Sequence, residues 1–241
     1  MEYVALGAAP GIAICLFIFY RDLYNKEPSQ NLIISFILGC LAILPAIGFE
    51  TSLANVNDGT TSGIALFAFC VVGFSEEFSK FLGLRLYSYN QKAFDEPLDG
   101  IIYAVMVSMG FATVENVMYA LKFHDMNVVI LRMFLSVPAH ASFAIIMGYF
   151  VGKAKFDSKK SFGLMLTGLL AAIFFHGTFD FFIFWSQQPG ADPNTTNTAL
   201  AGGAVVSFII SLILCRNMII SGQRISKHMF KDHTPPPPPN A

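Results

Sequence analysis

Charged residues are scarce in this chain of 241 residues, since Asp, Glu, Lys and Arg together make up 13% of it. A soluble domain carries roughly 25%, and a nucleic-acid-binding surface needs a basic excess that a net charge of −1 does not supply. Hydrophobic residues make up 54% of the chain, and the mean hydropathy is +0.58. The composition therefore excludes an ordinary soluble domain and a nucleic-acid partner, and it predicts a protein that lies in the lipid bilayer.

Cysteines are also few, and their spacing matches neither a disulfide framework nor a CxxC motif. They lie singly inside apolar runs, at Cys15, Cys40, Cys70 and Cys215. A secretory signal peptide is not expected either, because the first apolar stretch has no basic segment before it and ends in Tyr20, Arg21 and Asp22 instead of small residues. We therefore interpret this stretch as a retained helix.

Long apolar runs separated by polar loops predict an all-α, polytopic bundle of about seven transmembrane helices, since each crossing needs ~20 apolar residues. The predicted helices lie near Val4–Tyr20, Asn31–Phe49, Ser62–Tyr87, Leu98–Leu121, Val128–Val151, Phe162–Trp185 and Thr198–Cys215. Nearly all Lys and Arg residues of the loops fall on one side of this threading, and Lys122 falls on the other. Because Lys and Arg in short loops stay in the cytoplasm, we expect the N-terminus outside and the C-terminus inside.

The domain organisation follows from the same pattern. Residues 1–220 form one predicted transmembrane helical domain, and residues 221–241 form a cytoplasmic proline-rich tail that includes the run Pro235–Pro239. No internal repeat of the kind found in transporters built from two similar halves is evident in the sequence.

Ionisable side chains remain inside the predicted spans, although each Asp, Lys or Arg costs ~2.5–3.5 kcal/mol at a helix centre. They are Glu76, Glu77, Lys80, Glu115, Arg132, His140, His176 and Asp180. Because this free-energy cost recurs at so many positions, we expect the side chains to share one polar site inside the bundle. Carboxylates outnumber the basic residues in this set, and like charges in a poorly solvated site cannot all persist. Groups perturbed in this way are suited to general acid–base chemistry.

Helical spacing predicts that these side chains meet. Residues four apart lie near one another on a helix surface, which places Glu76 beside Lys80 and His176 beside Asp180. Glu77, three residues before Lys80 in the sequence, is also close enough to contact it. His140 and His176 also share helix faces with rows of small residues, which is typical of a face packed against protein rather than lipid. We expect one site at mid-depth that opens outward.

Four segments that carry these residues resemble the PrsW family of membrane proteases. They are Glu-Glu-Phe-Ser-Lys at Glu76–Lys80, Gly-Phe-Ala-Thr-Val-Glu-Asn at Gly110–Asn116, Pro-Ala-His at Pro138–His140 and His-Gly-Thr-Phe-Asp at His176–Asp180. Any one motif alone is a weak signal, but four in order on four predicted helices are specific. A more distant similarity links the chain to the CAAX prenyl endopeptidases, which place a histidine where this chain has Glu115.

The resemblance implies a membrane-embedded endopeptidase of the bacterial cytoplasmic membrane. Proteases of this family cut a single-span membrane protein such as an anti-sigma factor on its extracytoplasmic side, which is the first, site-1 step of regulated intramembrane proteolysis. An anti-sigma factor is therefore the expected partner. Two alternatives use the same residues: a proton- or ion-coupled transporter, and an inactive scaffold that binds membrane partners through its small-residue faces.

The resemblance also suggests a role for each residue. We expect one of Glu76 and Glu77 to activate water and the other to tune that base while pairing with Lys80. His176 is expected to protonate the leaving amine or to help bind water, and His140 to stabilise the oxyanion or bind the same water. Purely structural roles are the alternatives. Glu76 and Glu77 could form a buried ion pair with Lys80 that fixes helix packing, and His140 and His176 could form hydrogen bonds between helices.

Supporting roles fall to residues at the ends of the predicted spans. Asp180 is expected to orient His176, and Glu115 and Asn116 to support the site or contact a substrate carbonyl. Arg132, near the outer end of its span, is expected to extend to the membrane interface.

A metal is not required by this chemistry, and we expect glutamate-dependent hydrolysis without a cofactor. Zinc stays open as an alternative, with His140, His176 and either Glu76 or Glu77 as ligands, because three protein ligands plus water make a catalytic zinc site.

Overall fold

The computed structural model describes residues 2–188, 198 and 200–230, and the predicted proline run Pro235–Pro239 lies outside them. In this part of the chain the structure is helical without a strand, and seven helical segments are long and apolar enough to cross a membrane. The predicted all-α class and the number of spans are thereby confirmed.

The helices follow the predicted runs closely, with three spans divided into shorter elements. Their bounds are α1 Glu2–Arg21, α2 Ser29–Ser52, η1 Ala54–Val56, α3 Thr61–Leu66, η2 Phe67–Gly73, α4 Phe74–Leu86, η3 Ser88–Asn90, α5 Pro97–Phe123, α6 Met126–Phe134, α7 Ser136–Phe156, α8 Ser161–Ser186, η4 Leu200–Ala204 and α10 Val205–Met229.

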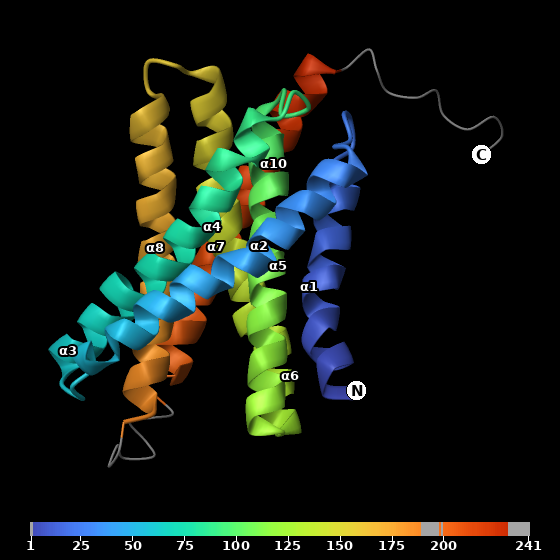
Figure 1. Ribbon diagram of the computed structural model, residues 1–241. Helices are drawn as coiled ribbons and strands as arrows, with labels where there is room; N and C mark the ends of the chain where they lie inside the picture. The colour runs from blue at the N-terminus through green and yellow to red at the C-terminus, as the bar shows by residue number, and fades with distance from the viewer. Residues whose placement is uncertain (1, 189–197, 199, 231–241) are drawn as a thin grey trace.

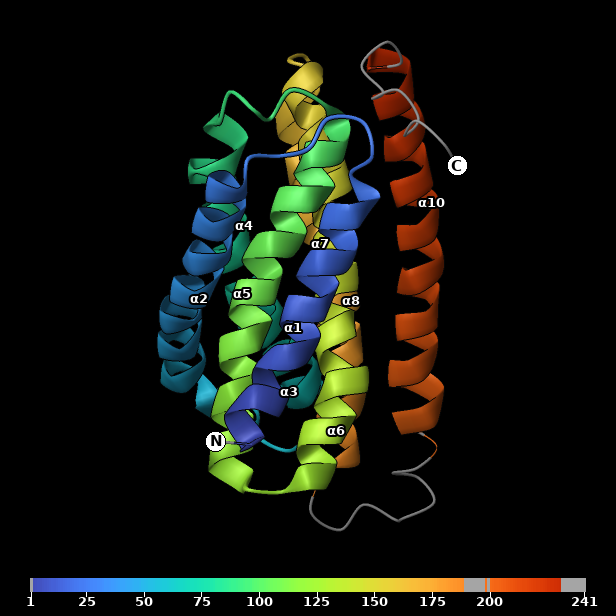
Figure 2. The same cartoon turned by 90° about the vertical axis from the view of Figure 1, so that its right-hand side faces the viewer.

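Helix α5 lies inside the bundle, with α1, α2, α4, α7 and α10 packed around it (Figures 1 and 2). Helix α2 crosses the bundle obliquely, and α8 packs on α7 and η2. The first residues of α1 and the last residues of α10 lie at opposite ends of the bundle (Figure 2), as an odd number of crossings requires. Which of these ends faces the cytoplasm stays a prediction from the loop charges.

The predicted helix Val128–Val151 is confirmed as one span, Met126–Phe156, which is divided at Leu135 into α6 and α7. Leu135 has φ −118° and ψ −64°, a distorted right-handed helical conformation. The cause is Pro138, which lacks the N–H that a continuous helix would donate to the carbonyl of Phe134.

The predicted helix Ser62–Tyr87 contains a π-helical segment, η2, just before the two glutamates. A π segment adds a residue to the helical turn and is frequent at functional sites. Here the backbone approaches α8 closely, since a Cβ on Gly73 would lie 3.3 Å from the Gly177 nitrogen and one on Gly177 would lie 2.9 Å from Phe69 Cα. The contact brings the start of α4 next to His176.

The last predicted helix, Thr198–Cys215, is longer than expected. Helix α10 continues through the predicted domain boundary at residue 220 and ends at Met229. The division into a membrane domain and a tail stays a prediction.

Helices α5 and α7 approach each other through glycines. A Cβ on Gly148 would overlap the Gly100 carbonyl oxygen and lie 2.8 Å from Ala104 Cβ, and a Cβ on Gly152 would overlap the Pro97 carbonyl oxygen. Small residues therefore set the spacing between these two helices, as the sequence pattern predicted.

A group of buried carboxylates lies where α1 ends and α2 and α5 begin. Its members are Asp22, Glu27, Glu96 and Asp99. Hydrogen bonds from protein groups hold one oxygen of each. The Glu27 amide donates to Asp22 Oδ2 at 3.0 Å, the Glu96 amide to Asp99 Oδ2 at 2.8 Å, the Ser226 hydroxyl to Glu96 Oε1 at 2.9 Å and the Tyr103 hydroxyl to Glu27 Oε2. Burial raises the pKa of Asp22 to about 6 and the pKa values of Glu27 and Glu96 to about 7.

Substitution of Gly148 by Ala is expected to lower the melting temperature of the detergent-purified protein. The new methyl group must push α5 and α7 apart, and overpacking of this kind costs ~1–3 kcal/mol. The matched control is Gly163→Ala in α8, where a Cβ meets no atom within 4 Å. Equal melting temperatures for the two variants would show that the α5–α7 contact is not as tight as described.

The buried carboxylates predict that stability falls as pH rises. Their pKa values in the folded protein lie above the ~4 of unfolded chains, so the folded state binds more protons and loses stability between about pH 4 and pH 7. The melting temperature should therefore be lower at pH 8 than at pH 5. Replacing both Glu27 and Glu96 by Gln should flatten this dependence, whereas Glu2→Gln, at an exposed position, should leave it unchanged.

Candidate active site

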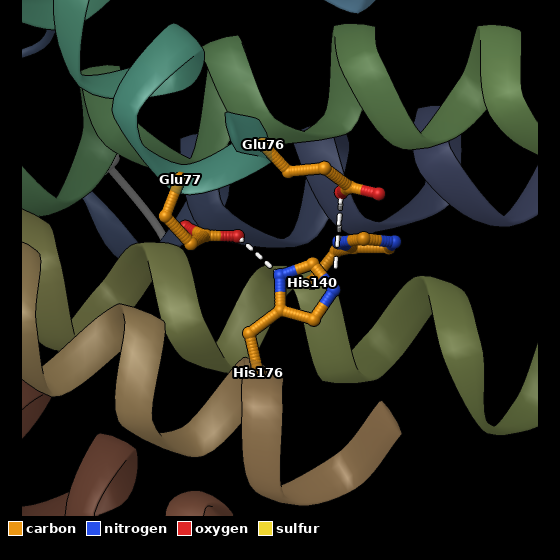
Figure 3. Close-up of side chains that lie close together, drawn as sticks. All are labelled: Glu76, Glu77, His140 and His176. Carbon is orange, nitrogen blue, oxygen red and sulfur yellow. Dashed lines mark hydrogen bonds and ion pairs between the residues drawn. The ribbon is translucent and has the colours of Figure 1, made fainter. Parts of the chain in front are cut away.

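Four side chains from three helices converge in the interior of the bundle. Glu76 and Glu77 come from the first turn of α4, His140 from α7 and His176 from α8 (Figure 3). All four are buried, and one ligand atom of each lies within 4.8 Å of the others. The predicted meeting of carboxylates and imidazoles is therefore observed.

Lys80 lies between the two glutamates and offsets part of their negative charge. Its ammonium nitrogen lies 3.0 Å from Glu76 Oε2 and 2.8 Å from Glu77 Oε1, as the spacing of four and three residues predicted. It also lies 3.1 Å from His140 Nδ1 and 4.2 Å from the centre of the Phe111 ring. One buried cation thus contacts three of the four converging side chains.

The two histidines are oriented by different carboxylates. His140 Nε2 lies 2.9 Å from Glu115 Oε2, and His176 Nδ1 lies 2.8 Å from Glu77 Oε1. The other ring nitrogens, His140 Nδ1 and His176 Nε2, lie 3.9 and 3.8 Å from Glu76 Oε2. Because Lys80 can only donate, His140 Nδ1 accepts its hydrogen bond, and the proton of this ring sits on Nε2.

The site has a more exposed edge, formed by Glu115 on α5, Arg132 on α6 and Asp180 on α8. The side chains of Glu115, Arg132 and Asp180 are 16%, 14% and 14% exposed. Asp180 Oδ2 lies 3.2 Å from His176 Nε2, as the four-residue spacing predicted.

Asn116 and Arg132 take positions that the sequence did not specify. Asn116 does not join the central cluster: its side chain donates to the Gly7 carbonyl at 2.8 Å and accepts from Arg132 at 3.0 Å. Arg132 was expected at the membrane interface, but it pairs with Glu115 at 2.8 Å. Arg132 is on α6, and its side chain reaches Glu115 on α5.

Glu50 is a site neighbour that sequence reasoning missed. It lies near the end of α2, accepts a hydrogen bond from the Ser75 hydroxyl at 3.0 Å and interacts electrostatically with Glu115, His176 and Asp180. The available signal was an acidic residue directly after the apolar run Asn31–Phe49, at the same end of the bundle as Glu115 and Asp180.

The donor set fits a divalent metal ion. Imidazole nitrogens and carboxylate oxygens are the ligands of catalytic zinc sites, and those of Glu76, Glu77, His140 and His176 lie close enough to share one ion. Among the described residues, Glu77 Oε2 is a buried oxygen without a hydrogen-bond donor. An anionic pocket with unused acceptor capacity is what a cation requires.

Comparison with known proteins agrees with this geometry. A family model described as PrsW family intramembrane metalloprotease matches residues 27–218. The Protease PrsW of Geobacillus kaustophilus is 35% identical over 187 residues, covering 78% of this chain and 82% of the relative. Those of Bacillus subtilis and Clostridioides difficile are 35% identical over 181 and 190 residues, covering 75% and 76% of this chain and 82% and 79% of the relatives. No solved structure matches the chain significantly.

Replacing Lys80 by Met is expected to destabilise the protein strongly, because the buried Glu76 and Glu77 lose their common cation. Breaking a buried ion pair by removing one partner costs ~3–5 kcal/mol, which thermal unfolding in detergent will detect. The control is Lys160→Met, since Lys160 lies 3.9 Å from Asp157 and its side chain is 78% exposed. A Lys80→Met protein as stable as wild type would mean that water, rather than the ammonium, neutralises the glutamates.

Proposed function

This chain belongs to the PrsW family of intramembrane metalloproteases, and from this premise we propose that it hydrolyses a peptide bond in a single-span membrane protein. An anti-sigma factor cut on its extracytoplasmic side, at the site-1 step, is the substrate we propose, in the cytoplasmic membrane of a bacterium. The convergence of Glu76, Glu77, His140 and His176 within 4.8 Å carries the proposal. The named relatives are bacterial proteases, which favours proteolysis over the transporter alternative.

Glu76, His140 and His176 are the residues that would hold the ion. Glu76 Oε2 lies 3.9 Å from His140 Nδ1 and 3.8 Å from His176 Nε2, and the opposite ring nitrogens already pair with carboxylates. Two histidines and one carboxylate leave a coordination position open. A bound zinc-like ion supplies activation of water and charge stabilisation at neutral pH. The sequence alone favoured metal-free chemistry, and the family description with this donor set favours the zinc alternative.

Glu77 is then the carboxylate available for proton transfer. Its Oε1 accepts from Lys80 and His176 at 2.8 Å each, while its Oε2 is buried without a donor. As the water oxygen bonds to the peptide carbonyl carbon, Glu77 takes the water proton. It then gives the proton to the amine as the C–N bond breaks. Lys80 limits the accumulation of negative charge on the glutamate pair.

The site's more exposed edge suggests how a substrate enters. Glu115, Arg132 and Asp180 form this edge, and α6, which carries Arg132, lies at the end of the bundle where α1 begins (Figure 1). The loop charges predict that this end faces outward, which would place the cleaved bond on the extracytoplasmic side.

Replacing Glu76 or Glu77 by Gln is expected to reduce cleavage by about 10²–10⁴-fold, the usual contribution of a catalytic acid–base group. The assay is co-expression with a tagged single-span protein, an anti-sigma factor first, followed by immunoblotting of fragments. The two variants should differ in metal content: Glu76→Gln should lose zinc on purification, and Glu77→Gln should retain it.

The matched control is Asp157→Asn, which alters a half-exposed carboxylate beyond the end of α7 and should cleave like wild type. Wild-type cleavage by both glutamine variants would refute the assignment. Full activity after stringent chelation, with no metal detected, would refute the zinc version. Ion flux in proteoliposomes that depends on the same glutamates, without proteolysis, would support the transporter instead.

A further inference from the structure

One carboxylate oxygen links the central cluster to helix α6. Glu115 Oε2 lies 2.9 Å from His140 Nε2 and 2.8 Å from Arg132 Nη2. A continuous chain of contacts therefore runs from the guanidinium through Glu115 to the imidazole ring. The central residue of the chain is on α5, and its two ends are on α6 and α7.

Arg132 is itself fixed from several directions. Its Nε donates to Asn116 Oδ1 at 3.0 Å, and Asn116 Nδ2 donates to the Gly7 carbonyl on α1 at 2.8 Å. The guanidinium carbon lies 3.9 Å from the centre of the Tyr119 ring. The planar guanidinium lies over the Tyr119 ring and donates a hydrogen bond to Asn116, so it has little freedom to rotate. It therefore holds Glu115 in one place.

The orientation of His140 depends on this arrangement. For Nδ1 to accept from Lys80 beside Glu76, the ring must carry its proton on Nε2 and donate it to an acceptor, and Glu115 is that acceptor. A carboxylate that binds the outer N–H of a metal-binding histidine sets both its tautomer and its ring direction. Loss of such a partner typically lowers metal affinity 10–100-fold.

We propose that Arg132 is a positioning residue of the metal centre, which acts through Glu115 to keep His140 Nδ1 directed at Glu76. The inference rests on the proposed function, because it requires that Glu76, His140 and His176 bind a divalent ion. It assigns a role in the site to α6, a short helix outside the matching motifs.

A packing role for Arg132 is the competing explanation, and the chain offers a matched control. Arg85 on α4 also stacks on a tyrosine, with its guanidinium carbon 4.6 Å from the centre of the Tyr89 ring. Arg85→Met therefore removes a stacked arginine away from the carboxylate–histidine chain, and Arg132→Met removes one within it.

The test measures zinc and cobalt affinity of the full-length chain in detergent, with the visible absorption of bound Co²⁺ as the reporter. Arg132→Met is expected to weaken zinc binding about 10–100-fold, and Arg85→Met to leave it unchanged. Adding Arg132→Met to Glu115→Gln should cause no further loss, because both changes interrupt one chain of contacts. Arg132→Lys keeps the positive charge but lacks the planar guanidinium group. Its zinc affinity should lie between those of wild type and Arg132→Met.

Histidine ¹⁵N NMR of the metal-free protein provides a second readout. Wild type, in which Lys80 and Glu115 both favour it, should show His140 protonated on Nε2. Arg132→Met should show a mixture of tautomers, because Lys80 alone then favours that form. Unchanged zinc affinity and an unchanged tautomer in Arg132→Met would overturn the inference, as would fully additive losses in the double variant. If Arg132→Met does not fold, Arg132→Lys carries the same comparison. A wild-type protein that binds no metal would refute the metal centre, and the tautomer measurement would still decide the role of Arg132.

Discussion

The contact of Lys80 with Glu76 and Glu77 is the interaction on which the site depends. Ionised carboxylates buried in a membrane protein are costly unless a cation lies close by. The Lys80 ammonium lies 3.0 and 2.8 Å from the two carboxylates and 3.1 Å from His140. Since all of these groups are buried, the ammonium makes it possible to hold two acidic groups and two imidazoles so close together.

That charge cluster can assemble only where helices approach closely. Gly148 and Gly152 let α7 contact the backbone of α5, and the Gly73–Gly177 approach sets α8 against the start of α4. These contacts determine the distances between His140, His176 and the glutamates, because each side chain extends from a backbone fixed by small residues. The packing of the apolar bundle and the geometry of the polar site therefore have the same origin.

Contacts within one helix were predictable from the sequence, and contacts between helices were not. The pairs Glu76–Lys80 and His176–Asp180 follow from the helical repeat, and both occur. The contacts Glu77–His176 and Glu115–His140 depend on how helices rotate against each other, which one sequence does not encode in any local pattern. Arg132 was misplaced because its partner Glu115 is on another helix, and the π segment η2 gives no periodic signal.

The structure contains a second group of buried carboxylates, and comparison of the two shows why only one resembles a catalytic centre. Around Glu27 and Glu96, neighbouring hydroxyl and amide groups donate hydrogen bonds, and burial raises the pKa of each to about 7. Protonation can therefore relieve that group near neutral pH. Around Glu76 and Glu77, an ammonium and two imidazoles lie within contact distance instead. A cluster that sets carboxylates beside imidazole nitrogens and an ammonium offers ligands to a cation and partners for proton transfer, whereas a cluster held by hydroxyl and amide donors does not.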